Sequence, residues 1–181
     1  MAPAALYFTE DPDACRLLAT DPFALLVGFA IDQQVPVPKA FAGPYVLKQR
    51  VGTLQTARLA AMDLTDAFRT PPAIHRFPGS MAERVRELAA VVTEEYGGDA
   101  SRIWSEAADT ADLRKRIGAL PGFGEMKIMA LGSVLSLHYG VAAADPLVPE
   151  SPCLGKVNSP EALADYQAKK RAHKAALRAA R

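Results

Sequence analysis

Apolar side chains recur at three- and four-residue spacing along most of the chain, which is the period of helices that bury one side. Residues 81–96 carry Val85, Leu88, Ala89, Val92 and Tyr96 in this pattern. Strand signals are weak, because no Asn-Gly or Asp-Gly turn separates alternating apolar and polar runs. The pattern predicts an all-α protein. The expected helices lie at about 11–19, 22–34, 37–50, 54–61, 65–69, 81–96, 100–107, 110–119, 125–139 and 160–178.

Several helix ends have sequence signals. Asp21-Pro22 and Ser159-Pro160-Glu161 each offer a capping side chain followed by a proline at the first helical position. Ser80-Met81-Ala82-Glu83 matches a capping box, and Gly97-Gly98 is typical of a helix end. Prolines interrupt the helical period in residues 141–158. We expect an extended connection there.

The chain has 181 residues, enough for one domain or two small lobes that share a cleft. Its first residues lack a signal-peptide pattern, and the apolar run 23–31 is too short to span a bilayer. These features predict a cytoplasmic, nucleoid-associated protein. Cys15 and Cys153 are the only cysteines, too few for a four-thiolate iron–sulfur cluster or zinc site, and we expect both to be free thiols.

Charge is distributed unevenly along the chain. Residues 156–181 hold seven basic and two acidic side chains, a net +5, which leaves −4 on residues 1–155 of a chain whose total is +1. A basic end on a mildly acidic body suits a polyanionic partner. A solvated helix with a fraying basic end is the alternative.

One pentapeptide carries the main functional signal. Leu120-Pro121-Gly122-Phe123-Gly124 lies between two predicted helices, so residues 110–139 form a helix-hairpin-helix. Gly124 directly precedes a helix, where free N–H groups and the positive end of the helix dipole bind phosphate. Gly122 and Gly124 let a phosphate approach the main chain. The alternative is a plain packing corner that uses glycine at its turn.

The chain resembles the helix-hairpin-helix (HhH-GPD) base-excision DNA glycosylase superfamily from about Asp21 to Asp145. The resemblance rests on 21–26 followed by Asp32-Gln33-Gln34-Val35, on 80–84, and on the hairpin at 120–124. It is strongest to a small bacterial subgroup without the iron–sulfur cluster. It implies a two-lobed helical domain at 1–158, with residues 159–181 as a basic C-terminal helix or tail.

Members of this superfamily flip a damaged base out of duplex DNA and hydrolyse its N-glycosidic bond. An aspartate about twenty residues beyond the hairpin stabilises the developing sugar cation or activates water. Asp145 matches it, 21 residues after Gly124, although Pro146 follows directly and a turn role is the alternative. Glu150 and Asp32 are the other candidate carboxylates.

The resemblance also assigns roles around the hairpin. Members with lyase activity carry a lysine two residues after the second hairpin glycine, where this chain has Met126. We therefore expect no Schiff-base chemistry, and Lys127 is expected to meet phosphate or solvent. Gln33 and Gln34 match the residue that fills the gap left by the flipped base; capping of a helix end is the alternative.

The family hairpin holds a monovalent cation, K⁺ or Na⁺, on main-chain carbonyls, here those of Gly118, Leu120 and Phe123. His75 lies nearest the family's base pocket and is expected at the surface, whereas His138 is expected to pack within the second hairpin helix. The aromatic residues weighed for stacking on a base, against a role in the core, are Phe41, Tyr45, Phe68, Phe77 and Trp104.

The sequence thus predicts a monomeric protein that binds double-stranded DNA and acts as a glycosylase without lyase activity. A catalytically inactive DNA-binding module is the main alternative. A helical scaffold that uses the hairpin only for packing is the third.

Overall fold

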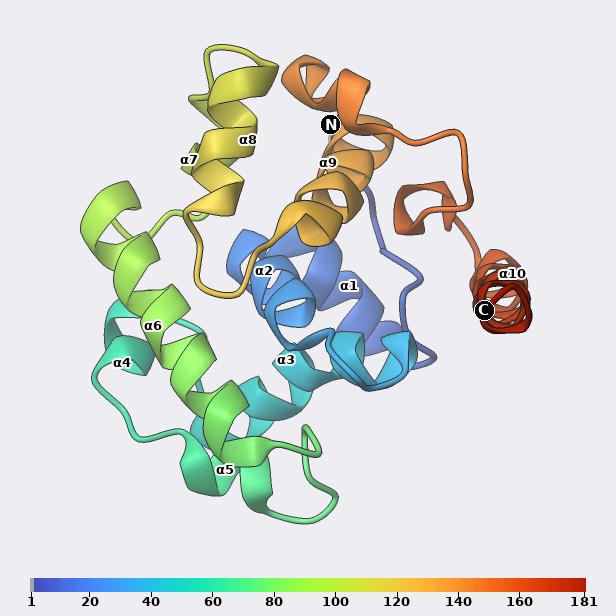
Figure 1. Ribbon diagram of the computed structural model, residues 1–181. Helices are drawn as coiled ribbons and strands as arrows, with labels where there is room; N and C mark the ends of the chain where they lie inside the picture. The colour runs from blue at the N-terminus through green and yellow to red at the C-terminus, as the bar shows by residue number, and fades with distance from the viewer. Residues whose placement is uncertain (1) are drawn as a thin grey trace.

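The computed structural model describes residues 2–181, and every regular element in that range is helical. The predicted all-α class is therefore confirmed. Ten α-helices and two 3₁₀ helices follow one another along the described chain (Figure 1): α1 Pro12–Thr20, α2 Pro22–Ile31, α3 Val37–Val51, α4 Thr56–Ala60, α5 Thr65–Arg69, α6 Pro78–Tyr96, α7 Arg102–Ser105, α8 Thr110–Gly118, α9 Glu125–Tyr139, η1 Ala142–Leu147, η2 Leu154–Lys156 and α10 Pro160–Ala179.

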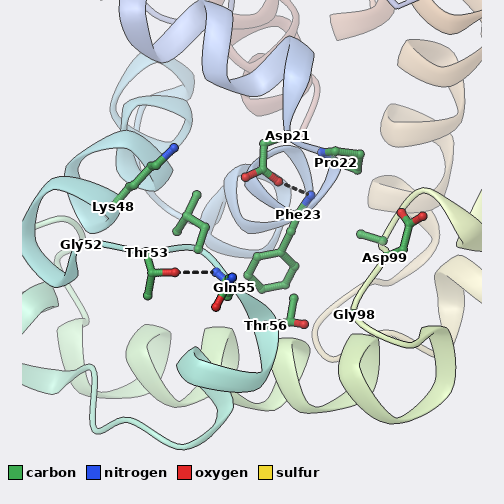
Figure 2. Close-up of a pocket in the computed structure, with 12 residues that line it drawn as sticks. Asp21, Pro22, Phe23, Lys48, Gly52, Thr53, Gln55, Thr56, Gly98 and Asp99 are labelled. Atoms are coloured by element: carbon green, nitrogen blue, oxygen red, sulfur yellow. Dashed lines mark hydrogen bonds between the residues drawn. The ribbon is translucent and has the colours of Figure 1, made fainter.

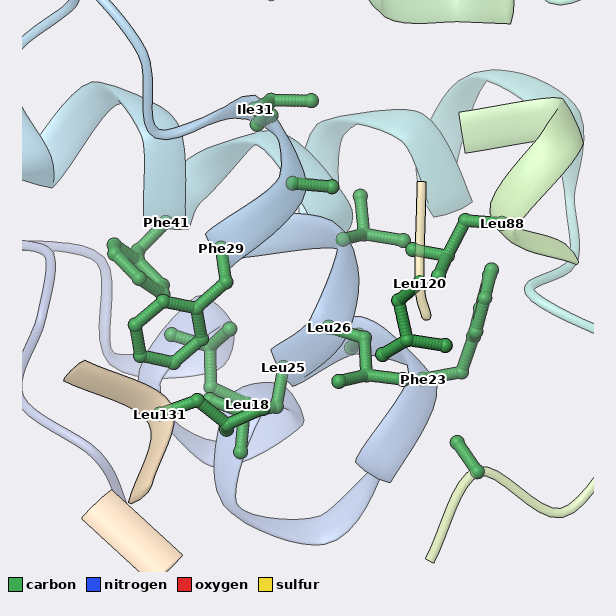
Figure 3. Close-up of a cluster of buried hydrophobic side chains, with 14 of the residues drawn as sticks. Leu18, Phe23, Leu25, Leu26, Phe29, Ile31, Phe41, Leu88, Leu120 and Leu131 are labelled. Atoms are coloured by element: carbon green, nitrogen blue, oxygen red, sulfur yellow. The ribbon is translucent and has the colours of Figure 1, made fainter. Parts of the chain in front are cut away.

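Helix α2 is the centre of the core. Asp21 caps it by accepting hydrogen bonds from the N–H groups of Phe23 and Ala24, and every residue from Phe23 to Ile31 is buried. A helix that is apolar all round is stable only inside the protein. Figure 3 shows its side chains among leucines of other helices, Leu88 of α6 and Leu120 and Leu131 of the hairpin region. The buried apolar residues form one continuous cluster.

Helices α1, α3, α6 and α9 lie around α2 (Figure 1). Helices α1 and α3 pack against it directly, α4 and α5 pack on α6, and α9 packs on η1 and η2. Helix α10 stands to one side of the rest. No single helix among residues 2–181 is long and apolar enough to cross a membrane; α1 and α2 together reach that length and composition, but they meet at an angle of 113°.

The segment 141–158 is more ordered than the sequence predicted. Its prolines exclude a regular α-helix, but they are compatible with the short 3₁₀ turns η1 and η2. Gly155 packs this segment against α9, and its N–H donates to Ser133 Oγ at 3.1 Å. The approach leaves no room for a side chain, because a Cβ on Gly155 would lie 2.4 Å from the Ser133 carbonyl oxygen. The expected extended connection is therefore wrong in detail.

Several helix starts agree with the sequence, with or without a capping side chain. Asp21 and Ser159 cap α2 and α10 as predicted. The capping box at 80–83 is wrong, because Pro78 occupies the first turn and starts α6 two residues before Ser80. Helix α2 ends at Ile31 rather than at residue 34, and α4 and α7 are shorter than predicted, whereas α9 has the predicted bounds.

Candidate functional site

The hairpin joins α8 to α9 by a six-residue turn, 119–124. Its apolar members, Leu120 and Phe123, are only 3% and 5% exposed and fix the turn to the core. Its glycines, Gly122 and Gly124, are exposed, and Gly122 has a left-handed φ of 79°. The apolar side chains therefore anchor the turn while its glycine backbone faces outward.

The N-terminus of α9 lies open beside this turn. Gly124 is extended (φ −87°, ψ −175°) and provides no capping side chain. No described group accepts a hydrogen bond from the N–H of Gly124, Glu125 or Met126. Arg114 of α8 pairs with the Glu125 carboxylate, and the Met126 side chain is 87% exposed. Free N–H groups at the positive end of a 15-residue helix favour an anion.

Arg84 of α6 links the hairpin to the loop after α2. Its Nη1 donates to Gln33 Oε1 at 2.6 Å. Its Cδ and guanidinium atoms lie 2.7–3.0 Å from the position that a Cβ on Gly122 would take. The φ of Gly122 favours glycine, and a Cβ there would also displace the Arg84 side chain packed over it. The sequence analysis gave Arg84 no role, since its immediate neighbours do not distinguish it from Arg86.

Lys127 makes a second link between the hairpin and α2. Its Nζ donates to the Ala30 carbonyl oxygen at 3.1 Å and lies 5.8 Å from the centre of the Phe123 ring. Burial, together with the nearby charge of Arg84, lowers the pKa of Lys127 to about 8. Lys127 was expected to meet phosphate or solvent. The solvent alternative is wrong, because the amine binds a C-terminal carbonyl of α2, where a cation is favourable; the phosphate contact stays a prediction.

Asp32 lies at the same end of α2 as its C-terminal cap. The side chain is half-buried, and no described residue forms a hydrogen bond or ion pair with its carboxylate. Burial raises the pKa of this carboxyl group, while the charges of Lys170, Lys127 and Lys174 oppose that shift. Asp32 is therefore a carboxylate within reach of several cations and without a direct partner.

His75 supports the loop 32–36, which follows α2. This side chain is fully buried; its Nε2 donates to the Gln33 carbonyl oxygen at 2.8 Å and its Nδ1 accepts from the Phe77 N–H at 3.0 Å. The expected surface position of His75 is therefore wrong. Gln34 is the one non-glycine residue with positive φ, 58°, in the described chain. Arg84 binds the Gln33 amide, so the exposed Gln34 side chain is the free one.

Asp145 lies elsewhere. It is exposed in η1, and Ser136 Oγ donates to its Oδ1 at 2.6 Å. Ser136 is twelve residues after Gly124 on α9, so the contact lies about 18 Å along the helix from the hairpin glycines. Glu150 is also exposed, and its backbone carbonyl accepts from Lys156 Nζ. The structure brings neither carboxylate to the hairpin.

The resemblance assigns a monovalent cation to the main-chain carbonyls of Gly118, Leu120 and Phe123. The carbonyl oxygens of Gly118 and Phe123 accept no hydrogen bond from the described residues. Pro121, three residues after Gly118, has no N–H that could donate to the Gly118 carbonyl. The Leu120 carbonyl accepts from the Phe123 N–H at 3.1 Å and retains a second lone pair. K⁺ or Na⁺ bound to these oxygens would add positive charge beside the N-terminus of α9.

Most aromatic residues belong to the core rather than to this face. Phe41, Phe68 and Trp104 are buried. Phe77 is 43% exposed and packs beside His75. His138 packs against Phe8, as expected for the second hairpin helix. Phe77, in the segment that supports the Gln33 loop, and Met126, in the first turn of α9, are large exposed apolar side chains.

The depression shown in Figure 2 is separate from the hairpin. It measures about 450 Å³ and lies between the start of α2, the end of α3 and the turn before α7. Three of its polar side chains already serve the local backbone: Asp21 caps α2, Thr53 Oγ1 accepts from the Gln55 N–H, and Asp99 accepts from the Ser101 N–H. None of the residues that the sequence predicted for the site lines this depression.

No group of three or more His, Cys, Asp or Glu side chains in residues 2–181 is placed to hold a metal ion. Cys15 and Cys153 are both buried free thiols. Comparisons of the chain with protein-family models, with curated proteins and with solved structures gave no match.

Proposed function

We propose that this protein binds duplex DNA through the hairpin and hydrolyses the N-glycosidic bond of a damaged or mispaired base, without lyase activity. The observation that carries the proposal is the contact of Arg84 with both Gly122 and Gln33. It joins an open, glycine-lined helix N-terminus to the glutamine loop at the end of α2. A phosphate-binding turn and a candidate base-flipping loop thereby share one face.

The DNA contact would be made mainly by the backbone. The N–H groups of 124–126 point out of the N-terminus of α9 and have no described acceptor. A phosphate bound there gains charge-assisted hydrogen bonds and the favourable end of the helix dipole. Such contacts position a protein on DNA without reading its sequence.

Gln34 is the side chain best placed to enter the duplex. Its amide is exposed, and its left-handed backbone stores strain of about 1 kcal/mol that the surrounding structure must hold. An amide that enters the base stack fills space and hydrogen-bonds the unpaired base. Gln33, held by Arg84, would position the loop rather than enter the stack.

For the chemical step, Asp32 is better placed than Asp145. It lies at the end of α2 that Lys127 contacts, and its carboxylate has no direct partner. A carboxylate there would stabilise the positive charge that develops on the sugar and accept a proton from the attacking water, while the base leaves with the bond electrons. Lys127 would keep the site positively charged for the strand.

The test uses duplexes that carry uracil, hypoxanthine, an alkylated purine or oxidised guanine, each treated with alkali after incubation. Asp32→Asn and Asp145→Asn form the matched pair. We expect alkali-dependent scission that falls about 100-fold or more in Asp32→Asn and persists in Asp145→Asn. The reverse result would move the catalytic role to Asp145. Strand breaks before alkali, or borohydride trapping of the enzyme on DNA, would contradict the absence of lyase activity.

The distance of Asp145 from the hairpin favours one second candidate, a binding module without catalysis. DNA binding that weakens with salt, without scission of any lesion duplex, would support that module and refute the hydrolase. Absent or salt-independent binding would refute both, since phosphate contacts must weaken with salt.

A further inference from the structure

Helix α10 is attached to the protein only at its base. Ser159 caps it, and Leu163 is its one buried residue. Tyr166 is half-buried, but every residue from 168 to 181 is exposed. In Figure 1 the helix, seen along its axis, stands beside the other helices rather than among them. Its last three turns therefore contribute little to the core.

The exposed part of α10 carries charge of one sign. No acidic residue follows Asp165. At 100° per residue, Lys170, Arg171, Lys174 and Arg178 fall within an arc of about 100° on one side of the helix. Lys169 lies outside this arc and pairs with Asp165 at 2.7 Å. We call Lys170, Arg171, Lys174 and Arg178 the basic stripe, and none of them forms an ion pair within the described chain.

The basic stripe continues the side of α10 that is attached to the rest of the protein. Leu163 and Tyr166, which attach α10, lie on the same side of the helix as the stripe. Lys170 Nζ lies 5.7 Å from the centre of the Tyr166 ring, and Lys170 and Lys174 are two of the three lysines whose charge acts on Asp32. The stripe thus begins beside the Asp32 end of α2 and continues outward along α10.

We propose that the basic stripe binds the phosphate backbone of the duplex that the hairpin holds, so that the protein grips DNA at two points flanking Asp32. The proposal rests on the proposed function for the identity of the partner. Charge complementarity favours a polyanion. A lipid surface is disfavoured, because the exposed turns are rich in alanine and Leu177 is their one large apolar side chain.

The experiment compares the parent protein, residues 1–181, with the triple variant Lys170→Gln, Lys174→Gln, Arg178→Gln. The control triple, Lys48→Gln, Arg58→Gln, Arg69→Gln, removes the same charge from exposed positions on α3, α4 and α5. Binding to an undamaged fluorescent duplex is measured by anisotropy between 50 and 300 mM KCl. Glutamine favours helices about as well as lysine and arginine, and circular dichroism checks that the helix content is unchanged.

Three lost phosphate contacts should lower the slope of log K against log salt by about 2 to 3 and weaken binding at 0.1 M salt about 10- to 100-fold. The control triple should leave the slope within about 1 of the parent value. Equal slopes for the two triples would overturn the proposal. The proposal would also be overturned if the parent protein bound vesicles of anionic lipid more tightly than the duplex and the stripe variant lost this binding.

A separate pair of variants tests the hairpin alone. Glu125→Pro removes one N–H at the first helical position, where proline is tolerated and where Gly124 is already extended; Glu125→Ala is its control. About tenfold weaker binding of Glu125→Pro, relative to Glu125→Ala, would support the hairpin contact. If the stripe variant at the same time binds as well as its own control triple, the stripe proposal fails. The opposite pattern supports the stripe and rejects the hairpin contact.

Discussion

Replacement of Lys127 by methionine should change how stability depends on pH. The pKa of Lys127 is about 8 in the folded chain, against 10.5 for an ordinary lysine. Below pH 8 the amine is charged in both states, and the folded state bears the cost of a partly buried ammonium. Between pH 8 and 10.5 the folded chain releases this proton while the unfolded chain keeps it. Stability from this group therefore rises with pH through that window.

The magnitude follows from the size of the pKa shift. The difference between pKa values of 10.5 and about 8 corresponds to about 3 kcal/mol in the free energy of unfolding, in the limit of full burial. The side chain keeps partial contact with water, so screening reduces the expected rise to about 1–2 kcal/mol. Loss of the hydrogen bond to Ala30 removes about 1 kcal/mol at all pH values. Lys127→Met should therefore be close to the parent in stability at pH 7.5 and less stable at pH 9.5.

The assay is urea unfolding at 25 °C at several pH values from 7.5 to 9.5. Cys15 and Tyr166, whose burial raises their pKa, lower stability as pH rises, but they act in both proteins and cancel in the difference. Lys115→Met, which removes an exposed amine from the same hairpin, is the control. Parallel pH profiles for Lys127→Met and the parent would refute the account of a partly buried ammonium.

Three further substitutions test the packing and its supports. Gly155→Ala should destabilise the protein by about 3 kcal/mol or more in urea unfolding, because the new Cβ would lie 2.4 Å from a backbone oxygen of α9. Gly79→Ala, in open space within α6, should stabilise it by about 0.5–1 kcal/mol, and a loss would contradict that environment. Burial lowers the pKa of His75, so it destabilises the fold as pH falls below about 6.5. His75→Phe should flatten the decline between pH 7 and 5 while costing about 1–3 kcal/mol at pH 7.

The elements that the sequence predicted well are those whose signals are local. Helix α9 follows a glycine turn, and α2 and α10 start at a capping side chain followed by proline, so their boundaries depend on adjacent residues. The start of α6 was wrong because two local signals, Pro78 and Ser80, lie two residues apart and the proline prevailed. Residues 141–158 were misjudged because their order depends on Ser133, which lies far from them in sequence.

In the candidate site, too, features with a local sequence signal were predictable, and contacts between residues far apart in sequence were not. The glycines and glutamines stand in recognisable motifs, so the sequence could select them as candidates. Arg84 was missed because its contact with Gln33 joins residues 51 positions apart. The contact of Lys127 with Ala30 was missed because the two residues are 97 positions apart. Asp145 was selected by its spacing alone, and spacing does not specify the direction in which the chain turns after α9.

The last turn of α2 belongs to the core and to the candidate site at once. Phe29 and Ile31 point into the packed interior, while Ala30 and Asp32 provide the carbonyl and carboxylate beside the hairpin. A core substitution that tilts this helix would therefore displace the binding groups before the protein unfolds. Random mutants selected for lost DNA binding should include folded variants in the interior of α2 that have no contact with the nucleic acid. If the proposed function holds, substitutions in the last turn of α2 will therefore affect stability and DNA binding together.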